Sequence, residues 1–404
     1  MMGNTLTLAV LSVTGLGFWL KCRNKSSLPL PLGLPADPII GHLRLIPPEA
    51  PADKLAEWGR MYGDVIHLRV LNRDLIILNT AEVASDLTDK RSENYNDRSY
   101  FPVLEQVKEE TKVNPRWQRV AYGHEINSND DPYLKIAEDS GYALTHCGPV
   151  GATPVDLLPI LQYFPSCFPG VYFAGQARIF SKYIQKLHEC PFSEVRKAMA
   201  AGTAKPSFLS YDLERLHREG NETPEEFVEV KGAVAVVYCA GTDTTWANLS
   251  IFMLAMTLHP ECQVRAHGEI DAHVDGSRLS EMTNRESLPF IDCILNETYR
   301  WLNAVPSGVP HKVVEDDVYR GMLIPKLGAL IFANIRICPG RHLADTSHLI
   351  AIATILSLYE IKARGPDGKE IIPEIALESG FTVHPKPYEC VVQTRNERAR
   401  KLVK

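Results

Sequence analysis

The hydrophobic pattern is strongest over residues 224–258, where it predicts a long helix. Pro224 and two glutamates open this segment and Pro260 follows it, which are typical start and stop signals. Apolar residues at helical spacing predict five further helices, over residues 53–62, 81–90, 260–274, 288–301 and 342–359. Helix therefore dominates the chain from Pro132 onward.

Short β-rich runs form a minority of the pattern. Residues 65–70 and 75–78 flank the turn Asn72-Arg73-Asp74, which is a hairpin signature. Residues 305–335 contain further short strand patterns, interrupted by proline and glycine. Because the strand pieces are scattered among helices, we predict a single α+β domain over residues 41–404 that is mainly α.

The first 20 residues predict a transmembrane anchor. No charge occurs between residues 5 and 20, and three basic residues follow by position 25. About 20 apolar residues can span the hydrocarbon layer, and the basic cluster after them favours a cytoplasmic location for the rest of the chain. A cleaved signal peptide is the alternative, but the basic start and small-residue cleavage site typical of one are missing. Residues 21–40 then form a basic flank and a proline-rich hinge.

The composition is that of an ordinary globular protein. The 404 residues are 45% hydrophobic and 23% charged, which excludes a disordered or collagen-like chain. A formal net charge of −6 argues against nucleic acid as a partner. The nine cysteines contain no C-x-x-C pair, so we expect a reducing compartment and one functional thiolate instead of a disulfide framework.

The strongest chemical signal surrounds Cys338, in the segment from Arg336 to Arg341. Cys338 lies just before the helix predicted at 342–359, so amide N–H groups and the helix dipole favour its thiolate. Such a thiolate suits axial ligation of haem iron. The alternatives are a buried structural cysteine, which is the usual fate of a lone cysteine, and a zinc site with His342 that lacks its other ligands.

Two further motifs lie within predicted helices. Residues 240–245, Ala-Gly-Thr-Asp-Thr-Thr, interrupt the apolar pattern of the long helix. Here the acid Asp243 precedes the alcohol Thr244, a pair that can relay protons, although a simple helix kink is the alternative. Glu297 and Arg300 lie on one helix face and can pair, but such pairs are common on surfaces and contribute little.

Together and in this order, the three motifs resemble those of the cytochrome P450 superfamily, most closely its fungal members in secondary metabolism. They match the A-G-x-D-T-T, E-x-x-R and R-x-C-P-G patterns of that family, and the resemblance covers residues 5–104 and 132–395. It implies the P450 fold with bound haem b, and a monooxygenase that inserts one oxygen atom from O2 into a hydrophobic small molecule. It also implies electrons from NADPH through a cytochrome P450 reductase, and a single-pass protein of the endoplasmic reticulum membrane with a cytoplasmic catalytic domain.

The resemblance further implies which residues form the site. They are the iron ligand Cys338, the proton-delivering pair Asp243 and Thr244, the haem-propionate partners Arg336 and His311, and the buried structural pair Glu297 and Arg300.

Departures from the family pattern predict an internally shortened chain. The family's phenylalanine and glycine before the cysteine are replaced by Ile331 and Asn334, and no Pro-Glu-Arg segment lies between residues 301 and 337. The W-R-x-x-R helix is also missing, with residues 117–119 a poor substitute. Parts of the helix C to E region and the meander are therefore expected to be absent.

This shortening leaves two alternatives to a monooxygenase. A buried glutamate–arginine pair without its third partner would cost on the order of several kcal/mol, so the chain could be an inactive or weakly haem-binding product of deletion or mis-splicing. A haem-thiolate isomerase or dehydratase is the other, but such relatives usually lose the acid–alcohol pair, which is present here.

Overall fold

The computed structural model describes fourteen stretches of the chain: residues 28–47, 51–71, 73–98, 115–126, 128, 130–145, 153–274, 278–306, 308–326, 330–332, 338, 340–365, 368–379 and 382–403. The expected anchor at residues 1–20 lies outside them. None of the helices that the structure describes combines the length and the apolar character that a membrane crossing requires.

The contacts divide the chain into two compact units, each assembled from segments far apart in the sequence. Unit 1 comprises Met1–Ile46, Asp53–Ser99 and Val309–Arg336, and unit 2 comprises Pro47–Ala52, Tyr100–Gly308 and Ile337–Lys404. Each unit has hydrophobic clusters of its own. The single domain expected over residues 41–404 stays a prediction.

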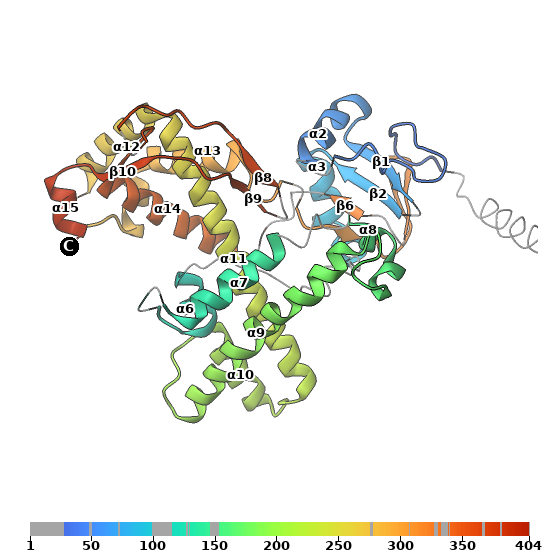
Figure 1. Ribbon diagram of the computed structural model, residues 1–404, viewed down its shortest axis with the longest axis horizontal. Helices are drawn as coiled ribbons and strands as arrows, with labels where there is room; N and C mark the ends of the chain where they lie inside the picture. Colours follow the sequence, from blue (N-terminus) through green and yellow to red (C-terminus); the bar gives the residue numbers. More distant parts are fainter. Residues whose placement is uncertain are drawn as a thin grey trace, which may run out of the picture. The chain divides into compact units, whose positions relative to one another are not determined.

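Unit 1 is built on the hairpin that the sequence predicts. Strands β1 (Val65–Val70) and β2 (Arg73–Leu78) pair antiparallel, with Val65 opposite Leu78 (Figure 1). Apolar β-branched and leucine side chains suit a strand whose faces are covered. Several of these are fully buried, namely Ile66, Leu68 and Ile76.

Two segments from residues 309–336 complete unit 1. Strand β6 (Leu330–Phe332) pairs parallel with β2 and antiparallel with β3 (His311–Lys312), which gives the sheet order β1-β2-β6-β3. Strands β4 (Asp317–Tyr319) and β5 (Met322–Ile324) form a separate antiparallel hairpin. The strands expected within residues 305–335 are therefore present.

The helix expected at residues 81–90 is divided. An α-helix, α3 (Ala81–Ala84), passes directly into a π-helical turn over Ser85–Asp89, and α4 (Ser92–Tyr95) follows. The amide of Lys90 donates to the carbonyl of Ser85, which is the i→i+5 bond of such a turn. The other helix of this unit, α2 (Pro51–Tyr62), agrees with its prediction.

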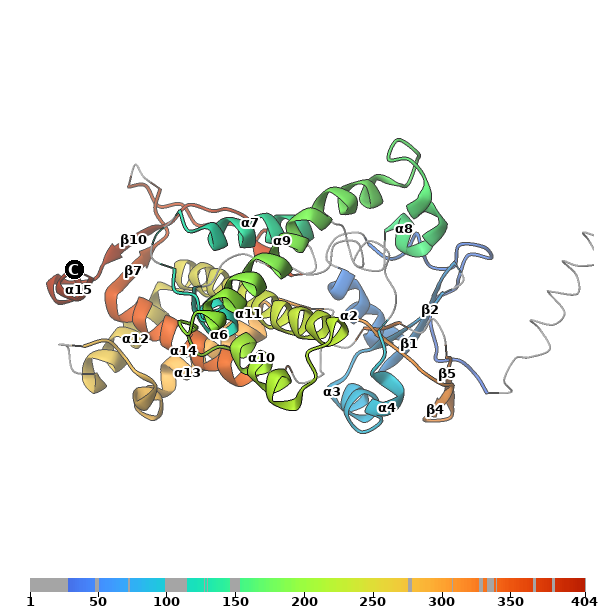
Figure 2. The same cartoon turned by 90° about the horizontal axis from the view of Figure 1, so that it is seen from below.

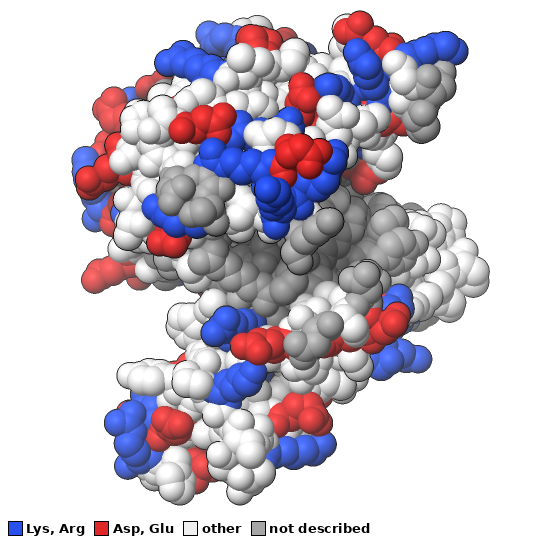
Figure 3. Space-filling view, turned by 90° about the vertical axis from the view of Figure 1, so that its left-hand side faces the viewer, with Lys and Arg blue, Asp and Glu red and all other residues white. Residues whose placement is uncertain are grey.

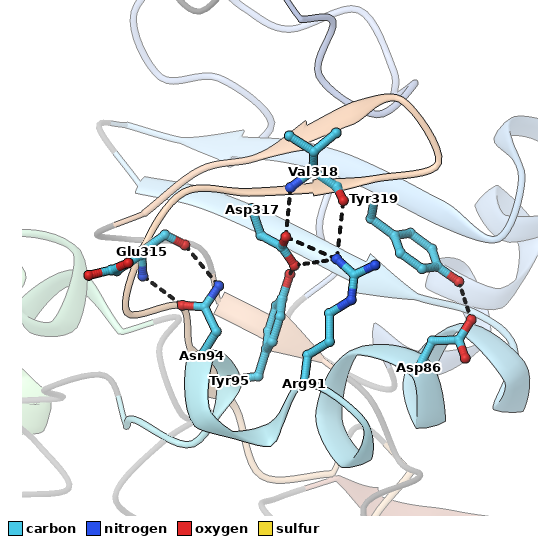
Figure 4. A network of polar contacts seen from close by, with 8 residues as sticks. All are labelled: Asp86, Arg91, Asn94, Tyr95, Glu315, Asp317, Val318 and Tyr319. Atoms are coloured by element: carbon cyan, nitrogen blue, oxygen red, sulfur yellow. Dashed lines mark hydrogen bonds and ion pairs between the residues drawn. The ribbon is translucent and has the colours of Figure 1, made fainter.

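A polar network fastens α4 to the β4–β5 hairpin. The carboxylate of Asp317 accepts hydrogen bonds from Arg91, from the hydroxyl of Tyr95 at 2.8 Å and from the amide of Val318 (Figure 4). Burial by itself would raise the pKa of Asp317, but these donors lower it below its usual value. The hydroxyl of Tyr319 donates to Asp86 in the same way.

Unit 2 is mainly helical. Its helices are α6 (Pro115–Tyr122), α7 (Pro132–Thr145), α8 (Pro154–Leu157), α9 (Tyr172–Ala200), α10 (Phe208–Glu219), α11 (Pro224–Leu258), α12 (Pro260–His273), α13 (Pro289–Trp301), α14 (Arg341–Leu358) and α15 (Glu397–Val403), with 3-10 turns at Pro159–Tyr163 and Met282–Ser287. Two antiparallel strand pairs accompany them: β7 (Tyr359–Lys362) with β10 (Val391–Thr394), and β8 (Leu377–Ser379) with β9 (Val383–Pro385).

Helix α11 connects the two largest hydrophobic clusters of this unit. Its first half packs with α6, α9 and α10 (Figure 2), and its second half packs with α12, α13 and α14. The helix begins as predicted, because the hydroxyl of Thr223 accepts from the amide of Glu226 and Pro224 needs no hydrogen bond for its nitrogen. Its bounds match the sequence prediction.

Helices α13 and α14 are held together by polar contacts. The hydroxyl of Tyr299 lies 2.7 Å from Nδ1 of His348, and Arg285 pairs with both Asp292 of α13 and Asp345 of α14. Burial lowers the pKa of His348 to about 4, so the ring that shares this hydrogen bond with the tyrosine is neutral.

Substituting Tyr95→Phe should destabilise unit 1. Tyr95 is fully buried, and its loss of one hydrogen bond to a carboxylate should lower the free energy of unfolding by about 1–2 kcal/mol. Chemical denaturation measures the change. Tyr163→Phe, at a tyrosine that is 81% exposed, is the control and should have no effect; equal effects of the two substitutions would contradict this role of the network.

Acid should weaken the contact between α13 and α14. Because the pKa of His348 is lower in the folded chain than the ordinary value of 6.5, the unfolded chain binds the proton more readily. The contribution of His348 to stability is thus fully present above pH 6.5. The free energy of unfolding should fall by up to about 3 kcal/mol as the pH drops toward 4. Chemical denaturation across this pH range should show that the free energy of unfolding falls less in His348→Asn than in wild type. The control His217→Asn, at an exposed histidine, should show the wild-type pH dependence.

Candidate functional site

Cys338 lies where the sequence predicts it, just before α14. Gly340 is the N-cap of that helix, and the amide of Arg341 donates to the carbonyl of Cys338 at 3.1 Å. The thiol is exposed and belongs to no disulfide. A free, accessible thiol at the entry to a helix fits an axial ligand of haem iron. Arg336, expected to contact a propionate, lies outside the described residues.

Helix α14 brings this cysteine loop close to the middle of α11. The two helices pack against each other, and Leu343 from the first turn of α14 contacts the cluster that includes Tyr238 and Cys239. These two residues directly precede the Ala-Gly-Thr-Asp-Thr-Thr motif. Helix α13, which carries Glu297 and Arg300, packs with both helices, so all three sequence motifs lie on, or directly before, helices that contact one another.

Threonines in the middle of α11 bond back to the helix itself. The hydroxyls of Thr242, Thr244 and Thr245 each donate to the carbonyl four residues earlier, at 2.7, 2.6 and 2.5 Å. Such bonds satisfy hydroxyl groups within an apolar helix. Thr244 is thus held by its own helix, facing the carbonyl of Ala240.

Asp243 is buried and is contacted by the β8–β9 segment. It is 4% exposed, and the hydroxyl of Thr382 donates to its Oδ2 at 2.5 Å. Nε2 of His384 lies 3.4 Å from its Oδ1. Sequence reasoning missed both partners. No local signal reveals them, because Thr382 and His384 lie more than a hundred residues from Asp243.

Glu297 and Arg300 form the expected pair, but at the surface. Two hydrogen bonds of 2.7 and 2.5 Å join them, and their side chains are 59% and 71% exposed. The expectation that this pair is buried is wrong for this structure. The reason is the orientation of α13, whose apolar face, with Ile294 and Leu295, packs into the core and leaves the charged pair outside.

His311 belongs to unit 1, where it is 2% exposed. Its Nδ1 lies 2.7 Å from the carbonyl oxygen of Tyr95, so that nitrogen is engaged by the backbone. The expected contact of His311 with a haem propionate stays a prediction.

Comparisons with known proteins agree with these motifs. The sequence model of the family described as "Cytochrome P450" matches residues 117–336. Cytochrome P450 monooxygenase claR of Ampulloclitocybe clavipes is 30% identical, with 99% of this chain and 92% of the relative covered. Cytochrome P450 monooxygenases 176 and 136 of Postia placenta are each 29% identical, covering 93% and 100% of this chain and 92% and 96% of the relatives. With its cysteine loop, its threonine-rich helix and these matches, this chain belongs to the cytochrome P450 family.

Proposed function

We propose that this chain is a haem-thiolate monooxygenase acting on a hydrophobic small molecule. The observation that carries this proposal is the free, exposed Cys338 at the entry to α14, in a chain of the cytochrome P450 family. Haem b, when bound, would supply the chemistry that activates O2 and inserts one of its atoms into substrate. Cys338 would hold the iron, with Arg336 and His311 as candidate partners of the propionates.

The residues of α11 would handle protons. Asp243 is a buried carboxylic group on a helix that contacts α14, and Thr244 is its neighbour along the chain. In this role Asp243 takes up a proton on a carboxylate oxygen and passes it to the hydroxyl of Thr244, which delivers its own proton to the reacting oxygen. Rotation of that hydroxyl away from the carbonyl of Ala240 would be needed for delivery.

The sequence also leads to proposals on partners and location. We infer that a cytochrome P450 reductase supplies electrons from NADPH. We further infer that the N-terminal segment, with the uncharged residues 5–20, attaches the chain to the endoplasmic reticulum membrane and that the catalytic part is cytoplasmic. The resemblance of the motifs to those of fungal members in secondary metabolism leads us to propose the same setting for this chain. Lys and Arg side chains lie interspersed with Asp and Glu on the face in Figure 3, which does not favour nucleic acid there.

Alignment lengths support an internally shortened chain. The match to monooxygenase 136 of Postia placenta includes the whole chain of 404 residues but runs over 510 positions. More than a hundred of these positions therefore have no counterpart here. The comparisons do not favour an inactive product, and the exposed Glu297 and Arg300 remove one physical reason for it, since neither charge of this pair is buried.

Thiolate ligation is tested by Cys338→Ser. The reduced, carbon-monoxide-treated wild type should show the red-shifted Soret band of a thiolate haem, and this variant should lose it because serine supplies no thiolate. Cys293→Ser, at another exposed free cysteine, is the matched control and should keep the band. A wild type without the band, or a Cys338→Ser variant that retains it, refutes the proposal.

Proton delivery is tested by Asp243→Asn. Loss of the carboxylate should slow oxygen consumption driven by NADPH and the reductase by about 10²-fold. The carbon monoxide spectrum should be unchanged, which shows that the variant folds and binds haem. Asp212→Asn, on the half-exposed side of α10, should consume oxygen at the wild-type rate; an Asp243→Asn variant that does the same excludes this role.

A further inference from the structure

The β8–β9 hairpin holds a buried polar cluster against α11. Asp243, Thr382 and His384 are 4%, 6% and 3% exposed. The hydroxyl of Thr382 is 2.5 Å from Oδ2 of Asp243 and 3.0 Å from Nε2 of His384, and that same nitrogen is 3.4 Å from Oδ1 of Asp243. The carboxylate is thus contacted on both oxygens by residues of the hairpin.

The hydrogen bonds of this cluster indicate the protonation states of Asp243 and His384. Thr382 has one hydroxyl proton, which it donates to Asp243, so its contact with His384 requires a proton on Nε2. Nδ1 of His384 is buried and has no hydrogen-bond partner among the described residues. A proton there would be a buried, unsatisfied N–H group, which is rare and unfavourable. The imidazole is therefore neutral with its proton on Nε2, and Asp243 is ionised, accepting from Thr382 with Nε2 of His384 3.4 Å from its other oxygen.

The histidine ring itself is fixed by packing. The ring of Trp246 lies 4.5 Å from that of His384, centroid to centroid, and Trp246 follows Asp243 by three residues on the same face of α11. The hairpin is also tied to the end of α13, because the amide of Val383 donates to the carbonyl of Ala304 at 2.8 Å. These contacts thus fix the position and orientation of the Nε2–H group of His384 before any ligand binds.

We propose that His384 is a positioning residue, which together with Thr382 clamps Asp243 as a carboxylate in one orientation, ready to take up a proton. This rests on the proposed function, in which Asp243 delivers protons. Without the clamp, the buried carboxylate would lose the hydroxyl of Thr382 and the neighbouring Nε2–H of His384, and burial would then disfavour more strongly the ionised form that accepts the proton.

The proton assignment is tested by nitrogen NMR of the full chain with bound haem. With ¹⁵N-labelled histidine in the reduced, carbon-monoxide-bound protein, the signals absent from His384→Gln belong to His384. They should show a protonated Nε2 and a bare Nδ1, and should change in Asp243→Asn, where the carboxylate is gone. A protonated Nδ1, or His384 signals that do not change in Asp243→Asn, would refute the proposed clamp.

Two substitutions separate the donor from the ring. Gln places an amide N–H near Nε2 but loses the ring, whereas Phe keeps a ring beside Trp246 but has no donor. His384→Gln should consume oxygen with NADPH and reductase within about threefold of wild type, and His384→Phe should be slowed about 10- to 100-fold. The reverse order, or equal rates in the two variants, overturns the proposal.

The outcomes separate this inference from the proposed function. A wild type without the thiolate band, or an Asp243→Asn variant with normal oxygen consumption, refutes the proposed function. A slow Asp243→Asn variant together with a wild-type rate in His384→Phe refutes the clamp alone.

Discussion

The packing of both halves of α11 against other helices is the constraint on which unit 2 depends. The helix has 35 residues, and its two halves belong to two different hydrophobic clusters. A largely apolar helix is stable only when other elements pack against it, and six other helices do so here. Each buried polar group in its middle must therefore find a partner inside the protein.

The threonine-rich motif and its surroundings follow from that requirement. Three threonine hydroxyls use carbonyls of their own helix, whereas the carboxylate of Asp243 can only accept hydrogen bonds. The β8–β9 hairpin supplies the hydroxyl of Thr382 as a donor and places Nε2 of His384 beside the other oxygen. A buried acid thus couples a strand pair near the C-terminus to the centre of the helix, beside α14, which Cys338 directly precedes.

Local signals were sufficient for much of the fold. Proline and the capping threonine at residues 223–224 define the start of α11, and the β-rich runs around Asn72 define the first hairpin. The helix predicted after Cys338 is likewise present, as α14. The π-turn at Ser85–Asp89 was missed, because a single extra residue in a helical turn changes no hydrophobic period.

By itself, the sequence determined the class of the fold, the order of its three motifs and the family to which the chain belongs. These depend on residue types at short spacing, where propensity, capping and periodicity act. Only the tertiary structure decided that Glu297 and Arg300 face solvent, that Tyr299 meets His348, and that Thr382 and His384 hold Asp243. Those contacts join residues distant in the chain, and they depend on how each helix is rotated against its neighbours, which no local pattern encodes.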